Sequence, residues 1–136
     1  MIPKPVLQAI VLADQVYTDR DSGKKVIAGT FNRLWATEFP ARFSRPTWAF
    51  ICLTNLQGRV EVNLRYIDLS SSEVLMETKP IPVQSEDRLA SLELMVQVPP
   101  FPMPHEGVYA FEVHAAGEML GSVRLQVNKR ETGDQS

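Results

Sequence analysis

Cysteine is nearly absent from this sequence. The 136 residues include one, Cys52, so no disulfide can form within the chain. Small secreted domains usually contain paired cysteines, because their hydrophobic cores alone are too small to keep them folded. A single cysteine therefore predicts a reducing compartment, and we expect a cytoplasmic protein.

Long hydrophobic runs are also missing. The apolar stretch at residues 6–13 is interrupted by Gln8, whereas a membrane-spanning helix needs about 20 apolar residues. The stretch has one preceding lysine and starts too close to Met1 for a typical secretory signal. We therefore expect neither export nor membrane contact.

Residues suited to catalysis are scarce. Of the two histidines, His105 lies in a proline-rich segment and His114 on the outward side of a predicted strand, and we expect both to face solvent. Cys52 lies in the most apolar run, which predicts a buried, unreactive thiol. The sequence has no phosphate-binding loop, nucleophile elbow or histidine pair at metal-ligand spacing. We expect no enzyme activity, no metal and no cofactor.

A calcium loop is also a poor fit to the acidic segment at residues 19–23. Two aspartates alternate there, but Gly23 comes one position too early and Thr30 stands where a glutamate ligand is needed. Because glycine and short polar side chains favour turns, we predict a plain hairpin turn.

The chain contains enough apolar residues to form one hydrophobic core. Apolar residues make up 44% of it and charged residues 22%, which is typical of a globular domain. Residues 1–50 carry seven Lys or Arg and four Asp or Glu, whereas residues 51–136 carry seven and twelve. Neither part has the strongly basic composition of a nucleic-acid-binding domain, so we expect no nucleic-acid partner.

Short runs of alternating apolar and polar residues recur about every ten positions, which is typical of an all-β domain. Eight runs can be counted, at about residues 5–17, 25–35, 47–53, 60–66, 73–83, 89–98, 108–115 and 119–128. We predict a single antiparallel β-sandwich of about eight strands over residues 1–128, immunoglobulin-like or a related Greek key, followed by a polar tail at 129–136. A small barrel and a helix at residues 86–94 remain alternatives.

One local pattern supports the sandwich. Gly107 precedes Tyr109 and Phe111, which are two positions apart on the penultimate predicted strand. This pattern resembles the tyrosine corner of immunoglobulin-like sandwiches. An ordinary buried tyrosine is the alternative, and in either case Tyr109 is structural.

Two runs break the alternation because both of their faces are apolar. They are residues 6–13 and 48–53, and such strands must be covered on both sides. The cover is either a connection of the same chain, at 39–45 or 99–104, or another subunit, most commonly in a homodimer. To this interface we assign Leu7, Ile10, Leu12, Ala49, Ile51 and Leu53.

Residues 33–48 form the second unusual segment, in which three arginines are interleaved with four aromatic rings. Arginine pairs with carboxylates and phosphates and stacks on rings, so the candidate ligand-binding residues are Arg33, Trp35, Arg42 and Arg45. The alternative, which we favour, is that the rings anchor a long connection to the core while the guanidinium groups stay in water.

The sequence also resembles a known group. The motifs L-A-D-Q-V-Y at residues 12–17 and G-K-K-V-I-A-G-T-F at residues 23–31, with segments 87–90 and 107–121, resemble a family of small bacterial domains of unknown function common in planctomycetes. This resemblance implies a bacterial cytosolic β-sandwich and brings no activity or cofactor. Asp14 and Tyr17 are either a functional pair or the end of a strand reaching its turn.

Taken together, the sequence predicts a non-enzymatic protein-interaction or structural module of a bacterial assembly. Its partner would be another protein or a second copy of the chain, bound through the apolar strand faces. The alternative is a ligand-binding sandwich that recognises an anionic ligand or a peptide through residues 33–48.

Overall fold

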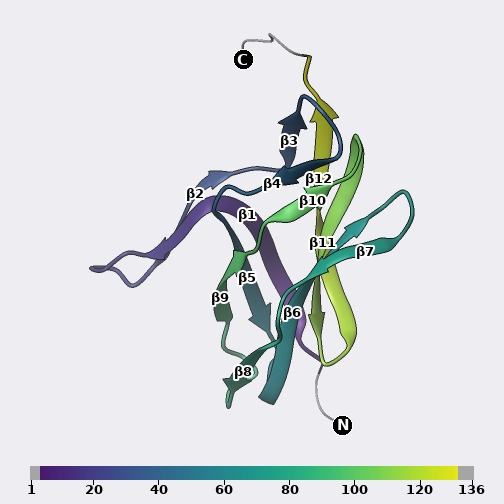
Figure 1. Cartoon of the computed structure of the whole chain (residues 1–136). Helices are drawn as coiled ribbons and strands as arrows, with labels where there is room; N and C mark the ends of the chain where they lie inside the picture. Colours follow the sequence, from purple (N-terminus) through teal and green to yellow (C-terminus); the bar gives the residue numbers. More distant parts are fainter. Residues whose placement is uncertain (1–3, 132–136) are drawn as a thin grey trace.

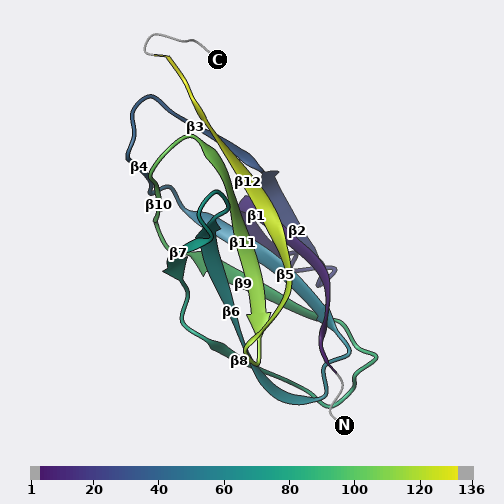
Figure 2. The same cartoon turned by 90° about the vertical axis from the view of Figure 1, so that its right-hand side faces the viewer.

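A computed structural model describes residues 4–131, which form two large β-sheets packed face to face and one small two-stranded sheet (Figures 1 and 2). The predicted all-β sandwich is confirmed, and the described residues contain twelve strands and no helix. The predicted polar tail at 129–136 lies largely outside the described residues, although Lys129 is the last residue of a strand.

The first sheet, which we call sheet A, has four strands. In spatial order they are β2 (Lys25–Thr30), β1 (Val6–Thr18), β5 (Thr47–Thr54) and β9 (Leu92–Val98). All three pairings are antiparallel.

The second sheet, sheet B, has the order β3 (Arg33–Ala36), β12 (Glu118–Lys129), β11 (Gly107–Ala115), β6 (Gly58–Asp68) and β7 (Glu73–Glu77), and β8 (Ile81–Ser85) pairs with the first half of β6. The predicted run at 73–83 is therefore two short edge strands, consistent with Pro80 and Pro82, because proline cannot donate a ladder hydrogen bond.

The distribution of strands is immunoglobulin-like. Strands β1, β5 and β9 form one layer and β6, β11 and β12 the other. One pairing departs from the antiparallel prediction, because β3 runs parallel to β12. The predicted run at 25–35 is split after Thr30, where the chain leaves sheet A, and resumes at Arg33 in sheet B.

The core between the sheets contains a cluster of aromatic rings. Tyr66 lies at its centre, with ring centroids 4.8 Å from Phe101, 5.4 Å from Tyr109 and 4.7 Å from Phe111. Aromatic pairs at these separations stabilise a core beyond the area that they bury.

The two connections considered as one possible cover of a sheet, at 39–45 and 99–104, do not cover the outside of sheet A. They contain β4 (Ala41–Phe43) and β10 (Phe101–Met103), which pair with each other. Phe43 and Phe101 lie 5.2 Å apart between ring centroids and belong to the main core. These segments therefore close the main core and leave the outside of sheet A uncovered.

The tyrosine corner is confirmed. The Tyr109 hydroxyl donates a hydrogen bond to the His105 carbonyl oxygen at 2.6 Å and accepts one from the His105 amide at 3.1 Å. The ring is fully buried. The bond fixes the chain where it enters β11.

The helix considered for residues 86–94 is wrong. Residues 86–91 form turns in which the Asp87 amide donates to Ser85 Oγ at 3.3 Å and the Leu89 amide donates to the Asp87 carboxylate at 2.9 Å. Such local hydrogen bonds compete with helix formation. Strand β9 then begins at Leu92.

Candidate functional site

The residues assigned to an interface lie inside the sandwich, which corrects that prediction. Leu12, Ala49, Ile51 and Leu53 are at most 1% exposed, and Leu7 and Ile10 pack against the same core. A strand that is apolar on both faces gives two alternating sets of residues, and its sequence does not say which set points inward.

The other set forms what we call the outer apolar face, on the outside of sheet A. Val11, Phe50 and Met95 are direct cross-strand partners on β1, β5 and β9. Around them cluster Ala9, Ala13, Val16, Ile27, Trp48 and Cys52. Met95 is 41% exposed, whereas Phe50 is only 8% exposed.

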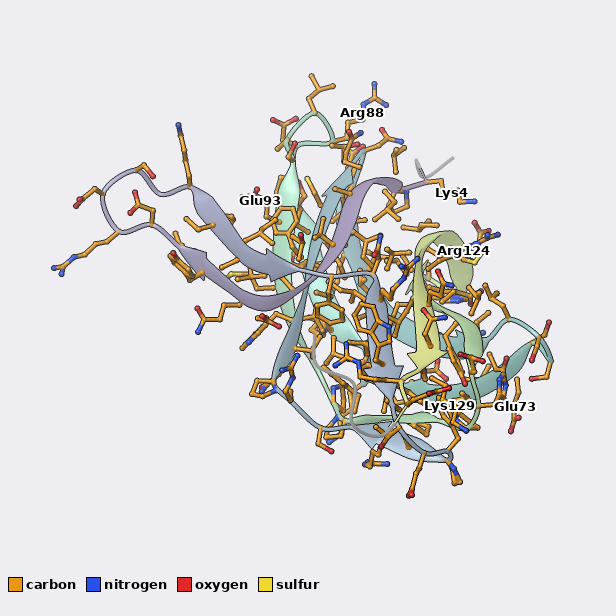
Figure 3. All side chains as sticks on the ribbon, turned by 90° about the horizontal axis from the view of Figure 1, so that it is seen from above. Lys4, Glu73, Arg88, Glu93, Arg124 and Lys129 are labelled. Carbon is orange, nitrogen blue, oxygen red and sulfur yellow. The ribbon has the colours of Figure 1, made fainter. Side chains whose placement is uncertain are left out.

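The β1–β2 hairpin covers part of this face. Val16 and Ile27 pair across the hairpin and pack with Phe50. Lys25 Nζ lies 3.9 Å from Glu93 Oε1 on β9, although β1 and β5 separate the two strands in the sheet. Figure 3 shows Glu93 beside the hairpin. The intramolecular cover is therefore the hairpin itself, and it leaves Met95 open.

Cys52 belongs to this face. The predicted buried thiol is only half-buried, because its side chain points outward between Ala9 on β1 and Glu93 on β9, its cross-strand partners. Its location makes Cys52 a natural chemical reporter for contacts made by the outer apolar face.

The outside of sheet B is polar at its centre, although Ala110, Ile67 and Val74 form an apolar cross-strand row beside the polar groups. Arg65 lies 3.3 Å from the Glu77 carboxylate, and Asn63 donates to the same carboxylate at 2.8 Å. His114, expected to face solvent, is 8% exposed, because its ring lies along the sheet with Nε2 2.8 Å from Glu112 Oε1. These polar groups pair with one another across the strands, although Arg65 Nε is buried without a hydrogen-bond partner among the described residues.

A second candidate site lies on the flank of the sandwich, where β1 and β2 approach β3. A cavity of about 350 Å³, which we call the arginine pocket, is lined by Asp14, Gly29, Thr30, Phe31, Arg33, Leu34, Trp35, Phe43, Arg45 and Arg130. It brings together three of the four predicted ligand-binding residues. Arg42 is not among them, because on β4 it alternates with Ala41 and Phe43, which pack on the core.

Sequence reasoning missed Arg130 as a member of the pocket. Its guanidinium carbon lies 5.1 Å from the centre of the Trp35 ring, and its amide donates to the Ala36 carbonyl oxygen at 2.8 Å. The parallel pairing of β3 with β12 brings these distant residues together, and no local pattern in the sequence announces that pairing.

Asp14 enters the pocket through its contact with Gly29. Gly29 has a φ of +74°, and a Cβ atom there would lie 2.5 Å from the Asp14 carboxylate. Only glycine fits both the backbone conformation and the close approach. Tyr17, the other polar residue of the motif, is exposed on the hairpin away from the pocket, so the two do not form a pair.

The arginine pocket carries excess positive charge. Three guanidinium groups share it with one carboxylate. Arg33 donates to Gln126 Oε1 at 3.1 Å and Arg45 lies 5.5 Å from the Phe43 ring centre. Within residues 4–131, none of the three arginines lies within 4.0 Å of a carboxylate. An incoming anion would therefore meet guanidinium groups that need not first leave a carboxylate.

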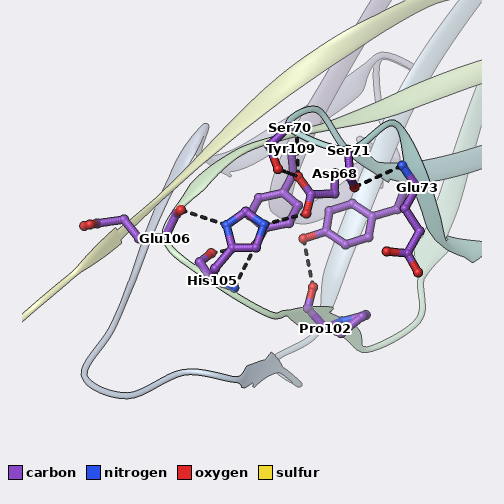
Figure 4. Close-up of polar contacts among 9 residues, drawn as sticks. Asp68, Ser70, Ser71, Glu73, Pro102, His105, Glu106 and Tyr109 are labelled. Atoms are coloured by element: carbon purple, nitrogen blue, oxygen red, sulfur yellow. Dashed lines mark hydrogen bonds and ion pairs between the residues drawn. The ribbon is translucent and has the colours of Figure 1, made fainter.

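A third polar cluster joins the end of β6 to the segment before β11 (Figure 4). Asp68 is buried, and its carboxylate accepts from Ser70 Oγ at 2.7 Å and contacts His105 Nε2 at 2.5 Å. The other ring nitrogen, Nδ1, lies 2.8 Å from the Glu106 carbonyl oxygen. Both ring nitrogens face acceptors, which favours the charged imidazolium.

The protonation of this cluster follows from those contacts. The hydrogen bond to the Glu106 carbonyl and that to Asp68 raise the pKa of His105 above its usual value. Burial by itself raises the pKa of Asp68, but the hydrogen bonds from Ser70 and His105 outweigh it, and the pKa is lowered. Burial also raises the pKa of Tyr66, whose hydroxyl donates to the Pro102 carbonyl at 2.9 Å.

This cluster is a clamp and lacks the arrangement of a hydrolase triad. In a triad the serine bonds the imidazole, which the acid then orients. Here Ser70 bonds Asp68 directly, and within residues 4–131 the two ring nitrogens of His105 contact only the Glu106 carbonyl oxygen and the Asp68 carboxylate, so no hydroxyl stands where a triad serine would. We assign the cluster to holding β6 and β11 together.

Comparison with protein-family models identifies the family to which the chain belongs. The model of a family described as a family of unknown function (DUF6941) matches residues 8–128. The chain belongs to this family. None of the curated proteins matches it. The predicted resemblance to a domain of unknown function is thus confirmed.

The DUF6941 match covers the outer apolar face and most of the arginine pocket, since Arg130 lies beyond residue 128. Both L-A-D-Q-V-Y and G-K-K-V-I-A-G-T-F lie within it. Among residues 4–131, no helix is long and apolar enough to cross a membrane.

Proposed function

We propose that this protein is a non-enzymatic protein-interaction module that binds through its outer apolar face, and that the occupant is a second copy of the chain. The observation that carries the proposal is the row Val11, Phe50 and Met95, which ends in an open apolar side chain beside the half-buried Cys52. Exposed apolar patches on soluble proteins commonly mark interaction surfaces.

The charges around the face favour self-association. Lys25 Nζ on β2 lies 3.9 Å from Glu93 Oε1 on β9, so one cation and one anion stand together beside the apolar row. A two-fold axis close to this pair would let Lys25 of one copy approach Glu93 of the other, twice per dimer. Such self-complementarity is what an isologous interface requires.

The setting that we propose is a bacterial cytosolic assembly. The single cysteine supports a reducing compartment. Its half-buried thiol on the outer apolar face fits a surface that is covered in an oligomer.

Cys52 provides the test. The rate of its alkylation by a small maleimide should fall as the protein concentration is raised from nanomolar to high micromolar, because a second copy would shield the thiol. Met95→Glu introduces a charge into the face and should make the rate independent of concentration. A wild-type rate that does not vary with concentration would reject self-association.

A second function is favoured by a separate observation, the presence of Arg33, Arg45 and Arg130 in one pocket without ion pairs among the described residues. We propose that this pocket recognises the anionic group of a ligand, since guanidinium groups bind carboxylates and phosphates through paired hydrogen bonds.

Trp35 reports on this second function. In a Trp48→Phe variant it is the only tryptophan, and it lines the pocket. Citrate and inorganic phosphate should each change its fluorescence to saturation, at an ionic strength held constant with chloride. The double variant Arg33→Ala/Arg45→Ala should abolish saturation. A linear response to both anions in the unaltered pocket would reject anion recognition.

A further inference from the structure

We propose that the arginine pocket is one part of a peptide-binding edge, and that an extended acidic segment of a partner protein adds as a strand to β3 and places a carboxylate among Arg33, Arg45 and Arg130. This inference rests on the second function proposed above. It adds the class of ligand and the way in which the ligand binds.

The free edge of β3 supplies the main-chain groups. β3 is the last strand of sheet B, and its pairing with β12 uses the Asn32 and Ala36 carbonyl oxygens, which accept from the Gln126 and Arg130 amides at 2.9 Å and 2.8 Å. Residues two apart in a strand direct their backbone groups to the same side. Arg33 and Trp35 therefore direct their N–H and C=O groups away from β12.

Unpaired strand edges recruit extended peptides, and the main-chain bonds supply affinity while side-chain pockets supply specificity. The edge of β3 is only four residues long, which is too short to attract strands without discrimination. An added peptide would depend on its side chains for most of its affinity.

Two cavities follow one another along β3 and offer the side-chain sites. The arginine pocket reaches from Arg33 to Trp35. A second cavity of about 480 Å³ continues from Trp35 through Ala36, Thr37 and Glu38 to Pro40, Ala41 and Arg130. Trp35 and Arg130 line both. Alternate residues of a strand point to one side about 7 Å apart, so residues i and i+2 of one peptide would enter successive cavities.

The two cavities differ in charge, and this difference defines the ligand. The arginine pocket is lined by three arginines and one carboxylate, Asp14. Arg130 also lines the second cavity, where Glu38 balances it and the remaining lining is mainly small or apolar. The excess positive charge therefore lies at the end of the edge that holds Arg33 and Arg45. The expected peptide carries Asp or Glu at one position and a small uncharged residue two positions away.

The same features argue against a nucleic-acid strand. Asp14 and Glu38 line the two cavities, and these carboxylates would repel a continuous phosphate backbone. A peptide instead needs one anionic side chain and a main chain that can pair with β3.

The test is selection of binders from a displayed library of random seven-residue peptides with the full chain as bait. Selected peptides are synthesised with a fluorophore, and their affinity is measured by anisotropy. We expect Asp or Glu at one fixed position and binding weakened about tenfold or more by Arg33→Ala/Arg45→Ala. The matched control Arg88→Ala/Arg124→Ala removes the same charge from exposed positions outside both cavities (Figure 3) and should change affinity less than about twofold.

Strand addition is tested separately from charge. Methylation of alternate amide nitrogens in the selected peptide should weaken binding in one register, where the amides face β3, and leave it nearly unchanged in the other. The proposal is overturned if no peptide is selected, if no acidic position is fixed, if the arginine variant binds as well as the wild type, or if both methylated peptides bind equally. If citrate still saturates the Trp35 signal in any of these cases, anion recognition stands and only the peptide edge is lost.

Discussion

The two outer faces of the sandwich differ in chemistry at their centres. Across sheet A, cross-strand pairing places Val11, Phe50 and Met95 in one row, whereas across sheet B it places Arg65 directly opposite Glu112. Both sheets bury their other face in the same core. The fold therefore tolerates charged residues at the centre of an outer face, and we assign a further role to the apolar row of sheet A.

Part of that role is internal, because the β1–β2 hairpin packs on Phe50. The part that is left open, around Met95, is the part that we assign to a second copy. The following predictions separate the internal role from the external one and compare each with the polar face.

The largest effect is expected at the covered part of the apolar face. Phe50→Ala should lower the free energy of unfolding by about 3 kcal/mol or more, since the ring is 8% exposed and packed under the hairpin. On the polar face, Arg65→Ala removes a partly exposed ion pair and should cost about 1 kcal/mol or less. Urea denaturation measures both. Equal losses would mean that the apolar face has no packing role within the chain.

An intermediate effect is expected at the tyrosine corner, which belongs to neither outer face. Tyr109→Phe removes the hydroxyl bonded to His105 and should cost about 1 kcal/mol. The loss should be the same at nanomolar and micromolar protein, whereas stability that depends on the outer apolar face should grow with concentration. Concentration dependence of the Tyr109→Phe loss would argue that the corner also supports the dimer.

The smallest effect is a dependence on pH confined to the Asp68–His105 clamp. The pKa of His105 is raised in the folded state, so its stabilisation is complete below the unfolded pKa of about 6.5 and is lost as pH rises through the folded pKa. The pKa of Asp68 is lowered, so its stabilisation is complete above about 3.8 and is lost as pH falls through the folded pKa.

Urea unfolding between pH 6 and 9 checks the histidine side of the clamp. The wild type should become slightly less stable with rising pH, and His105→Gln should remove that slope. An unchanged slope in the variant would assign the effect to another group.

Local patterns in the sequence predicted most of this fold, and long-range pairings account for what they missed. Alternation located the long strands, and the spacing of Gly107 and Tyr109 indicated the corner, because both signals lie within a few residues. The pairing of β4 with β10 was missed, because each strand is three residues long and one contains Pro102.

In the candidate sites too, residues close together in the sequence were predicted, and a residue brought in by a long-range pairing was missed. Arg33, Trp35 and Arg45 were predicted together because they are neighbours in the sequence, whereas Arg130 joins them only through the parallel pairing of β3 with β12. The apolar strands were recognised, but their inward set was assigned to the interface. That choice depends on how the sheets pack, which alternation alone does not contain.

The central claim is that the open part of the outer apolar face binds a second copy, and the most direct measurement is molar mass by light scattering during size exclusion. At micromolar concentration in moderate salt, the wild type should have twice the mass of the chain and Met95→Glu the mass of one chain. The control Arg124→Glu, at an exposed position of β12 in sheet B, should remain a dimer. A wild-type mass of one chain would contradict the claim.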